Sequence, residues 1–81
     1  MQLSLIKNDD IYLSIAKNLK KQRKKKKITQ QELAKITGYS YAYIRRIEAP
    51  RCEKNFSILT LYNISKALNI NISSLFEDDN I

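Results

Sequence analysis

The sequence predicts an all-α domain of five short helices, and three observations support this prediction. First, 43% of the 81 residues are apolar and the chain holds only one Gly and one Pro, which suits a helical domain and argues against disorder. Second, apolar residues recur three and four positions apart, which is the period of an α-helix. Third, residues that cap helices stand before these stretches. A chain of this length forms one domain with a modest core.

The first predicted helix follows an Asp-Asp pair at 9–10 and extends to about Lys26. Either Asp can cap its first turn, and the lysines near its end suit the negative pole of the helix dipole. Ile11, Ile15 and Leu19 follow one another at intervals of four residues. We therefore expect these three side chains to form one buried stripe.

The second predicted helix spans about 30–37 and starts with a capping box. Thr29 and Glu32 have the T-x-x-E spacing in which each side chain accepts a hydrogen bond from the other's backbone N–H. Gly38 is expected to end this helix with a positive φ. The residues predicted to be buried are Leu33 and Ala34.

The third predicted helix, about 41–48, begins after the N-cap residue Ser40 and buries Ile44 and Ile47. Two helices joined by a short turn that contains Gly form the helix-turn-helix motif. The sequence therefore predicts this motif at the centre of the chain.

The last two predicted helices follow an irregular segment, because Pro50 cannot continue a helix. Ser57 is expected to cap a helix of about 58–69, and a short fifth helix is expected at about 72–77. The chain is thus divided into an N-terminal arm at 1–10, a helix-turn-helix domain at 11–77 and an acidic C-terminal tail at 78–81.

Positive charge is concentrated in the middle of the chain. The net charge is +7, and 13 of the 15 Lys and Arg residues lie between residues 17 and 54, where the local charge is +10. A basic region on a nearly neutral scaffold indicates a polyanionic partner. The alternative is a solvated face that only keeps the protein in solution.

The composition argues against an enzyme. The sequence has no His and a single cysteine, Cys52, so no catalytic set or Cys cluster can be written, and we expect no metal, cofactor or internal disulfide. No apolar run is long enough to cross a membrane, and the basic run has few apolar residues for a membrane surface. No RNA-binding sheet motif or GXXG loop is present either. We therefore expect a cytoplasmic protein without a membrane partner.

From Leu19 to Phe76 the chain resembles the XRE, or Cro/repressor-type, helix-turn-helix family. The resemblance rests on "ITQQELAKITGYS" and "YIRRIE" in the predicted motif and on "LYNISKALNINISSLF" downstream. It implies a compact five-helix lambda-repressor-like domain with a central helix-turn-helix. It also implies a sequence-specific transcriptional regulator of the repressor type, which binds a palindromic operator in double-stranded DNA as a homodimer.

The resemblance implies roles for residues outside the recognition helix. Arg23 matches an arginine that pairs with the glutamate at the end of the recognition helix, here Glu48. Gln30 matches a glutamine that opens the second helix and holds a phosphate. Lys27 stands where the family usually has a helix-ending glycine, so we expect it to carry a positive φ.

In such motifs the N-terminal residues of the second helix contact base edges in the major groove. The strongest candidate is Arg46, because a guanidinium can bind guanine O6 and N7 together, worth about 1–3 kcal/mol of discrimination. Its alternative role is a phosphate contact, and the alternative for Ser40 is to act only as the N-cap. Tyr39 and Tyr43 are expected to be structural. The predicted base contacts are Ser40, Tyr41, Ala42 and Arg46.

The predicted phosphate contacts surround the recognition helix. Arg45 lies about 100° around the helix from Arg46, so it could reach a flanking phosphate or point into solvent. Backbone N–H groups at a helix start also bind phosphate, which gives Gln30 a second reason for its position. The predicted contacts are Gln30, Arg45, Arg51, Lys54 and Asn55.

The C-terminal part is more apolar than a short last helix needs, and a small domain benefits from dimerisation. We therefore expect a dimer interface there, although Leu75 and Phe76 could instead close the monomer core. An alternative function is a DNA-binding antitoxin, whose partner would be a toxin protein, or a restriction–modification controller. The candidate interface residues are Ile70, Ile72, Leu75 and Phe76.

Overall fold

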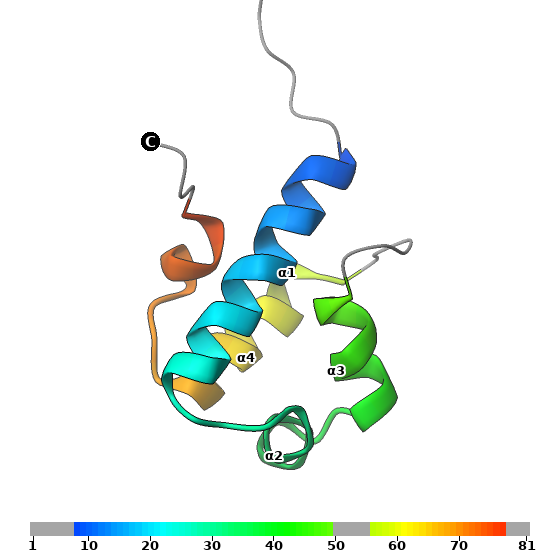
Figure 1. The fold of residues 1–81 in the computed structure, drawn as a ribbon, viewed down its shortest axis with the longest axis vertical. Coiled ribbons are helices and arrows are strands. Elements are labelled where there is room, and N and C mark those ends of the chain that lie inside the picture. The colour runs from blue at the N-terminus through cyan, green and yellow to red at the C-terminus, as the bar shows by residue number, and fades with distance from the viewer. Residues whose placement is uncertain (1–7, 50–55, 78–81) are drawn as a thin grey trace, which may run out of the picture.

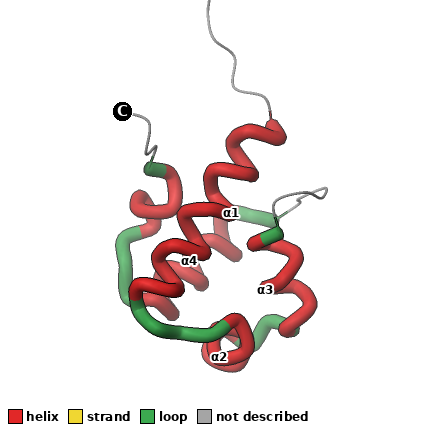
Figure 2. The backbone as a smooth tube through the Cα atoms, viewed as in Figure 1, coloured by secondary structure: helices red, strands yellow, loops and turns green. Residues whose placement is uncertain are grey.

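A computed structural model of the chain describes residues 8–49 and 56–77 (Figure 1). Within these ranges the backbone is helical or irregular, without strands (Figure 2). The elements are the α-helices α1 (Asn8–Lys25), α2 (Gln30–Thr37), α3 (Tyr41–Glu48) and α4 (Ile58–Leu68), and the 3-10 helix η1 (Ile72–Phe76). The predicted all-α class is confirmed, whereas the fifth element is not an α-helix.

The short length of η1 explains the difference from the predicted fifth helix. Five residues make little more than one turn, and a single turn carries the full cost of helix nucleation. The residue before it, Asn71, makes no side-chain cap hydrogen bond. Short pieces of this kind commonly adopt the tighter 3-10 geometry.

Helix α1 begins at Asn8, so Asp9 and Asp10 lie in its first turn and do not precede it as predicted. The predicted buried stripe is correct for Ile15 and Leu19, but Ile11 is 40% exposed. Figure 1 shows the reason, because the first turns of α1 project beyond the other helices of the domain.

The end of α1 is closed by the predicted left-handed residue. Lys27 has φ 60°, and the next residue, Ile28, donates its backbone N–H to the Arg23 carbonyl at 3.1 Å. This bond spans the six-residue ring of a Schellman motif, which satisfies a carbonyl that the helix end would otherwise leave unpaired. A lysine therefore occupies a position that glycine would adopt with less strain.

The predicted caps of α2 are present. Thr29 Oγ1 accepts from the Glu32 N–H at 3.0 Å, and Glu32 Oε1 accepts from the Thr29 N–H at 2.8 Å. Gly38 ends the helix with φ 84° and donates to the Ala34 carbonyl. The hydroxyl groups of Ser40 and Ser57 cap α3 and α4 in the same way, each accepting from the N–H three residues on.

The core lies between α1, α4 and the two helices of the motif. Helix α1 packs on α3 and η1, while α4 packs on α2 and η1. Buried apolar residues from every helix and from the segment before α4 meet in one cluster: Ile15, Leu19, Leu33, Ala34, Ile44, Ile47, Phe56, Leu61, Ile64, Leu68 and Leu75. The helix-turn-helix is therefore held on a scaffold made by α1 and α4.

One buried polar residue, Asn18 on α1, holds η1 in place. Its side chain is 5% exposed, and its Nδ2 donates to the carbonyl of Leu75 at 3.0 Å and to that of Glu77 at 2.6 Å. Both acceptors are backbone carbonyls at the end of η1 that would otherwise lack a helical partner. Sequence reasoning missed this contact, since Asn18 follows no apolar or capping pattern.

Candidate nucleic-acid interface

Helix α3 has one face in the core and one in solvent. Ile44, Ile47 and Glu48 are buried, and they anchor the helix from beneath. The exposed residues of α3 are Tyr41, Ala42, Arg45 and Arg46. The structure thus brings four predicted DNA-contacting residues together on the outer face of one short helix.

Ser40 stands at the start of this face and is engaged as the N-cap of α3. Its Oγ accepts a hydrogen bond from the Tyr43 N–H at 3.0 Å. Capping is the alternative that the sequence offered for this residue, and the bond fixes the direction in which the chain enters α3. The predicted base contact of Ser40 remains a prediction.

The two arginines of α3 lie over different aromatic rings. The Arg46 Cζ atom is 5.6 Å from the centroid of Tyr43, and the Arg45 Cζ atom is 5.5 Å from that of Tyr41. Both distances are within the range of cation–π attraction. The guanidinium groups are therefore directed apart, as their positions on the helix suggested.

Tyr43 is itself held by the scaffold. Its ring meets that of Tyr39 edge-on, with centroids 5.2 Å apart, and its hydroxyl lies 3.4 Å from Thr60 Oγ1 on α4. The Tyr39 hydroxyl accepts from Asn63 Nδ2, also on α4, at 2.9 Å. These contacts join the start of the recognition helix to α4, which agrees with the structural roles expected of both tyrosines.

The end of α3 is tied to α1 by the ion pair that the family resemblance implied. Arg23 and Glu48 are 7% and 6% exposed. Arg23 Nε donates to Glu48 Oε2 at 2.6 Å, and its Nη2 donates to Oε1 at 2.9 Å. A third donor, Nη1, reaches the Ile28 carbonyl at 2.8 Å. This two-point geometry fixes the recognition helix against α1.

Gln30 is half-buried at the first position of α2, and its Nε2 donates to Glu48 Oε1 at 3.0 Å. Its side chain therefore links the start of α2 to the end of α3. The helix start around it also presents backbone N–H groups, which is where an anion such as phosphate binds. The structure thus adds a positioning contact to the predicted phosphate role.

Exposed positive charge is concentrated at the end of α1. The lysines at the end of α1, Lys20, Lys21 and Lys24 to Lys27, are all exposed. The exposed carboxyl of Glu32 is held in the capping box, and hydrogen bonds from the Thr29 backbone and then its side chain lower the pKa of Glu32 below 4.5. The predicted phosphate contacts Arg51, Lys54 and Asn55 lie outside the described residues.

The candidate dimer residues do not share one environment. Leu75 is fully buried in the monomer core, so its predicted place in a dimer interface is wrong, because no atom of it is available to a partner. Ile70 and Ile72 are partly buried against that core, whereas Phe76 is 42% exposed. Closing the core is thus the role of Leu75, the alternative that the sequence allowed.

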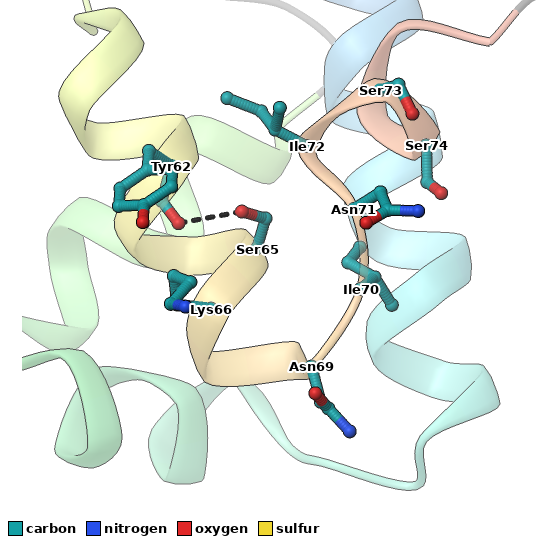
Figure 3. A pocket seen from close by; sticks show the side chains of 9 residues that line it. All are labelled: Tyr62, Ser65, Lys66, Asn69, Ile70, Asn71, Ile72, Ser73 and Ser74. Atoms are coloured by element: carbon teal, nitrogen blue, oxygen red, sulfur yellow. Dashed lines mark hydrogen bonds between the residues drawn. The ribbon is translucent and has the colours of Figure 1, made fainter.

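An open groove of about 770 Å³ runs between α4 and the segment that leads into η1 (Figure 3). Tyr62 and Lys66 line one wall and Ile70 and Ile72 belong to the other. Beside it, α4 exposes further apolar side chains, with Ile58 66%, Leu59 64% and Tyr62 47% exposed. Sequence reasoning missed this apolar surface, which lies on α4 rather than on η1.

The described residues, 8–49 and 56–77, form neither a metal-binding cluster nor a membrane-spanning helix. No three or more His, Cys, Asp or Glu residues there gather in a way that could hold a metal ion. Among the same residues, no helix combines the length and the apolar character that a membrane span needs.

Comparison with known proteins decides the family. A family model described as helix-turn-helix matches residues 19–75, which include the whole of α2 and α3. The chain belongs to the XRE-type helix-turn-helix family of DNA-binding regulators. The resemblance seen in the sequence is therefore confirmed.

Relatives of this helix-turn-helix protein are known in sequence and in structure. The control protein C.SmaI of Serratia marcescens is 35% identical over 66 residues, which cover 82% of this chain and 76% of that protein. The restriction-modification controller protein C.AhdI of Aeromonas hydrophila matches with a TM-score of 0.73 and 25% identity, over 80% of this chain and 96% of that one.

A third protein supports the fold alone. The hypothetical transcription factor NHTF from Neisseria matches with a TM-score of 0.79 over 98% of this chain and 88% of its own, at 23% identity. The arrangement of the helices is therefore one that this chain shares with both solved structures.

Proposed function

We propose that this protein binds a palindromic operator in double-stranded DNA as a homodimer and thereby controls transcription, with α3 in the major groove. The observation that carries the proposal is the outer face of α3, where Tyr41, Ala42, Arg45 and Arg46 are exposed together. The N-terminal part of the second motif helix is the part that contacts base edges in proteins of this kind.

The proposed contacts fall into two classes. Arg46 reads a guanine, Tyr41 and Ala42 contact neighbouring bases, and Ser40 approaches the base edges from the N-cap. Arg45 and Gln30 bind flanking phosphates, which set the register of the helix without reading sequence. The same backbone role is proposed for Arg51, Lys54 and Asn55, and the lysines of α1 supply long-range attraction.

We further propose that the homodimer forms through the exposed apolar face of α4, with Ile58, Leu59 and Tyr62, together with Phe76. A palindromic operator needs two copies related by a two-fold axis, and a two-fold interface uses the same patch on both copies. Ile58, Leu59 and Tyr62 lie on α4 and Phe76 lies on η1, whereas the proposed base contacts lie on α3 and at its N-cap. One surface can therefore bind the second copy while the other binds DNA.

The gene context that we favour is a restriction–modification system, because the similar protein C.AhdI is a restriction-modification controller protein and the relative C.SmaI is a control protein. The antitoxin alternative would require a toxin protein as a second partner, and no observation on this chain favours it. In either context the protein acts in the cytoplasm, where its DNA is. Where the operator overlaps a promoter, a bound dimer would exclude the polymerase and repress.

The test is selection of bound sites from a random duplex pool at about 0.15 M salt. We expect a two-fold symmetric site with half-sites about one helical turn, or 10 base pairs, apart. Arg46→Ala should lose preference at one base pair per half-site, by roughly 1–3 kcal/mol. Arg45→Ala should instead weaken binding to all duplexes and reduce the salt dependence. Lys17→Ala, an exposed charge on α1, serves as the charge-matched control.

Two outcomes would contradict the proposal. If no sequence is enriched while binding still falls steeply with salt, the charges contact only the DNA backbone. The homodimer is wrong if the enriched site lacks symmetry and sedimentation finds no dimer. In that case the protein without DNA sediments only as a 9.5 kDa species, and no complex of two protein chains with one duplex forms. Leu59→Lys tests the interface separately, since it should abolish the dimer and leave the monomer folded.

A further inference from the structure

Arg46 is the only arginine of α3 whose aromatic partner is itself fixed to the scaffold by contacts that the structure shows. Its Cζ lies 5.6 Å from the Tyr43 centroid, and Tyr43 is half-buried between Tyr39 and Thr60. Arg45 pairs with Tyr41, which is 43% exposed at the surface. The two arginines are adjacent in sequence, but Arg46 lies over a half-buried tyrosine that contacts α4, whereas Arg45 lies over an exposed one.

We propose that Tyr43 is a positioning residue for base recognition, which holds the Arg46 guanidinium in the direction that reads its base pair. This inference rests on the proposed function, because it assumes that Arg46 contacts a base. Tyr43 acts through the face of its ring and not through DNA contact of its own.

The physical reason is the cost of ordering a long side chain. Arginine has several rotatable bonds, and a flexible arginine loses much conformational entropy when it meets two acceptors on one guanine. A side chain already placed over a ring loses less on binding, so the correct base is bound more tightly. A misdirected guanidinium can reach a phosphate instead, which carries no sequence information.

The support behind Tyr43 comes from α4. The Tyr43 hydroxyl lies 3.4 Å from Thr60 Oγ1, and Thr60 is 7% exposed. The neighbouring ring of Tyr39 is fixed by Asn63 Nδ2, 2.9 Å from its hydroxyl. The two rings contact each other edge-on, and each also contacts α4. The ring beneath the Arg46 guanidinium is therefore held in place by the scaffold.

The test measures discrimination, which is the Kd for a duplex changed at the base pair assigned to Arg46 divided by the Kd for the selected duplex. Tyr43→Leu removes the ring face and should lower this ratio about two- to five-fold, the size of an exposed cation–π contact. Tyr43→Phe keeps the ring and loses only the hydroxyl, so its ratio should stay close to that of the wild type. Discrimination at other base pairs should be unchanged in both variants.

A double-mutant comparison separates positioning from a general loss of structure. In an Arg46→Ala background, Tyr43→Leu should have no further effect on the ratio, because the side chain that it positions is absent. Replacement of Tyr43 by pentafluorophenylalanine keeps the ring shape and reverses its face potential. This variant should lower the ratio as Tyr43→Leu does, and it stays informative if the leucine variant does not fold.

The inference is overturned if either ring-altering variant leaves the ratio unchanged, or if Tyr43→Phe lowers it as much as Tyr43→Leu does. A loss of affinity that is equal for all duplexes and parallel to a loss of thermal stability would also overturn it, since that indicates a structural role only. If Arg46→Ala changes no base preference, this inference fails while the operator model survives. If the wild-type chain enriches no site, the proposed function fails as well.

Discussion

Gln30 Nε2 lies 3.0 Å from Glu48 Oε1, so the residue that opens α2 is bound to the residue that closes α3. Arg23 Nη2 donates to the same oxygen at 2.9 Å from α1. Three helices are thus fixed at one buried carboxylate. The angle between the two motif helices depends on this polar junction as well as on the apolar core beneath them.

Glu48→Ala should destabilise the domain by about 3–5 kcal/mol, because it leaves the Arg23 guanidinium buried without its partner. This is a large share of the stability of a small domain. Urea unfolding followed by circular dichroism measures the change. Glu48→Gln keeps an oxygen that can accept from Arg23, so it should lower the unfolding free energy clearly less than Glu48→Ala. Equal losses in the two variants would show instead that the negative charge of Glu48, and not its hydrogen bonds, stabilises the domain.

The stability of the domain should contain an acid-sensitive part from Glu32. Hydrogen bonds from the Thr29 backbone and side chain lower its pKa in the folded state below its ordinary value of 4.5, so the folded state favours the ionised carboxylate. This contribution is present above pH 4.5 and is lost as the pH falls through the folded pKa.

Glu32→Gln should therefore flatten the curve of unfolding free energy against pH below pH 4.5. The measurement is a series of urea titrations at several pH values for both proteins. As a control, Thr29→Ala should lower stability by about 0.5–2 kcal/mol at neutral pH, since it removes the N-cap oxygen. Parallel curves for the wild type and Glu32→Gln would contradict the prediction.

Lys27→Gly should raise stability by roughly 1 kcal/mol, because Lys27 has φ 60° and glycine adopts this conformation without a Cβ clash. The matched control is Asn69→Gly at the end of α4, where φ is 57°. Asparagine tolerates the left-handed region better than lysine, so its replacement should bring a smaller change. Thermal unfolding of both variants tests the order, and a larger effect at Asn69 would refute it.

Leu75→Ala should cost about 2–5 kcal/mol, since Leu75 is fully buried and its truncation leaves a cavity. Phe76→Ala should cost much less in the monomer, because that ring is 42% exposed. Sedimentation should show the reverse order for self-association, with a weaker dimer only in the Phe76 variant. The pair thus separates closure of the core from contact with a second copy.

The elements that the sequence predicted best are those whose signals are local. The capping box of Thr29 and Glu32, the N-cap Ser40 and the positive φ of Gly38 each depend on residues within one helical turn. The bounds of α2 and α3, and therefore the exposed face of the recognition helix, could be read from them. The positive φ of Lys27 followed from the family resemblance.

What the sequence could not show depends on residues far apart in the chain. The exposure of Ile11 and the burial of Leu75 depend on which surfaces meet α1, and the same periodicity fits both outcomes. The hydrogen bonds of Asn18 with η1 and of Gln30 with Glu48 correspond to no repeating pattern in the sequence, so the sequence does not predict them. The direction of Arg46 over Tyr43 is likewise a matter of rotamers, which spacing along a helix does not determine.

The two hydrogen bonds from Asn18 span 57 and 59 positions of the chain. During synthesis on the ribosome, the side chain of Asn18 emerges long before the carbonyls of Leu75 and Glu77 exist. A nascent chain that already contains the complete helix-turn-helix motif therefore still lacks the two hydrogen bonds that hold η1 against α1. Commitment to the native fold, and with it the appearance of a competent regulator, should wait until residue 77 has left the exit tunnel.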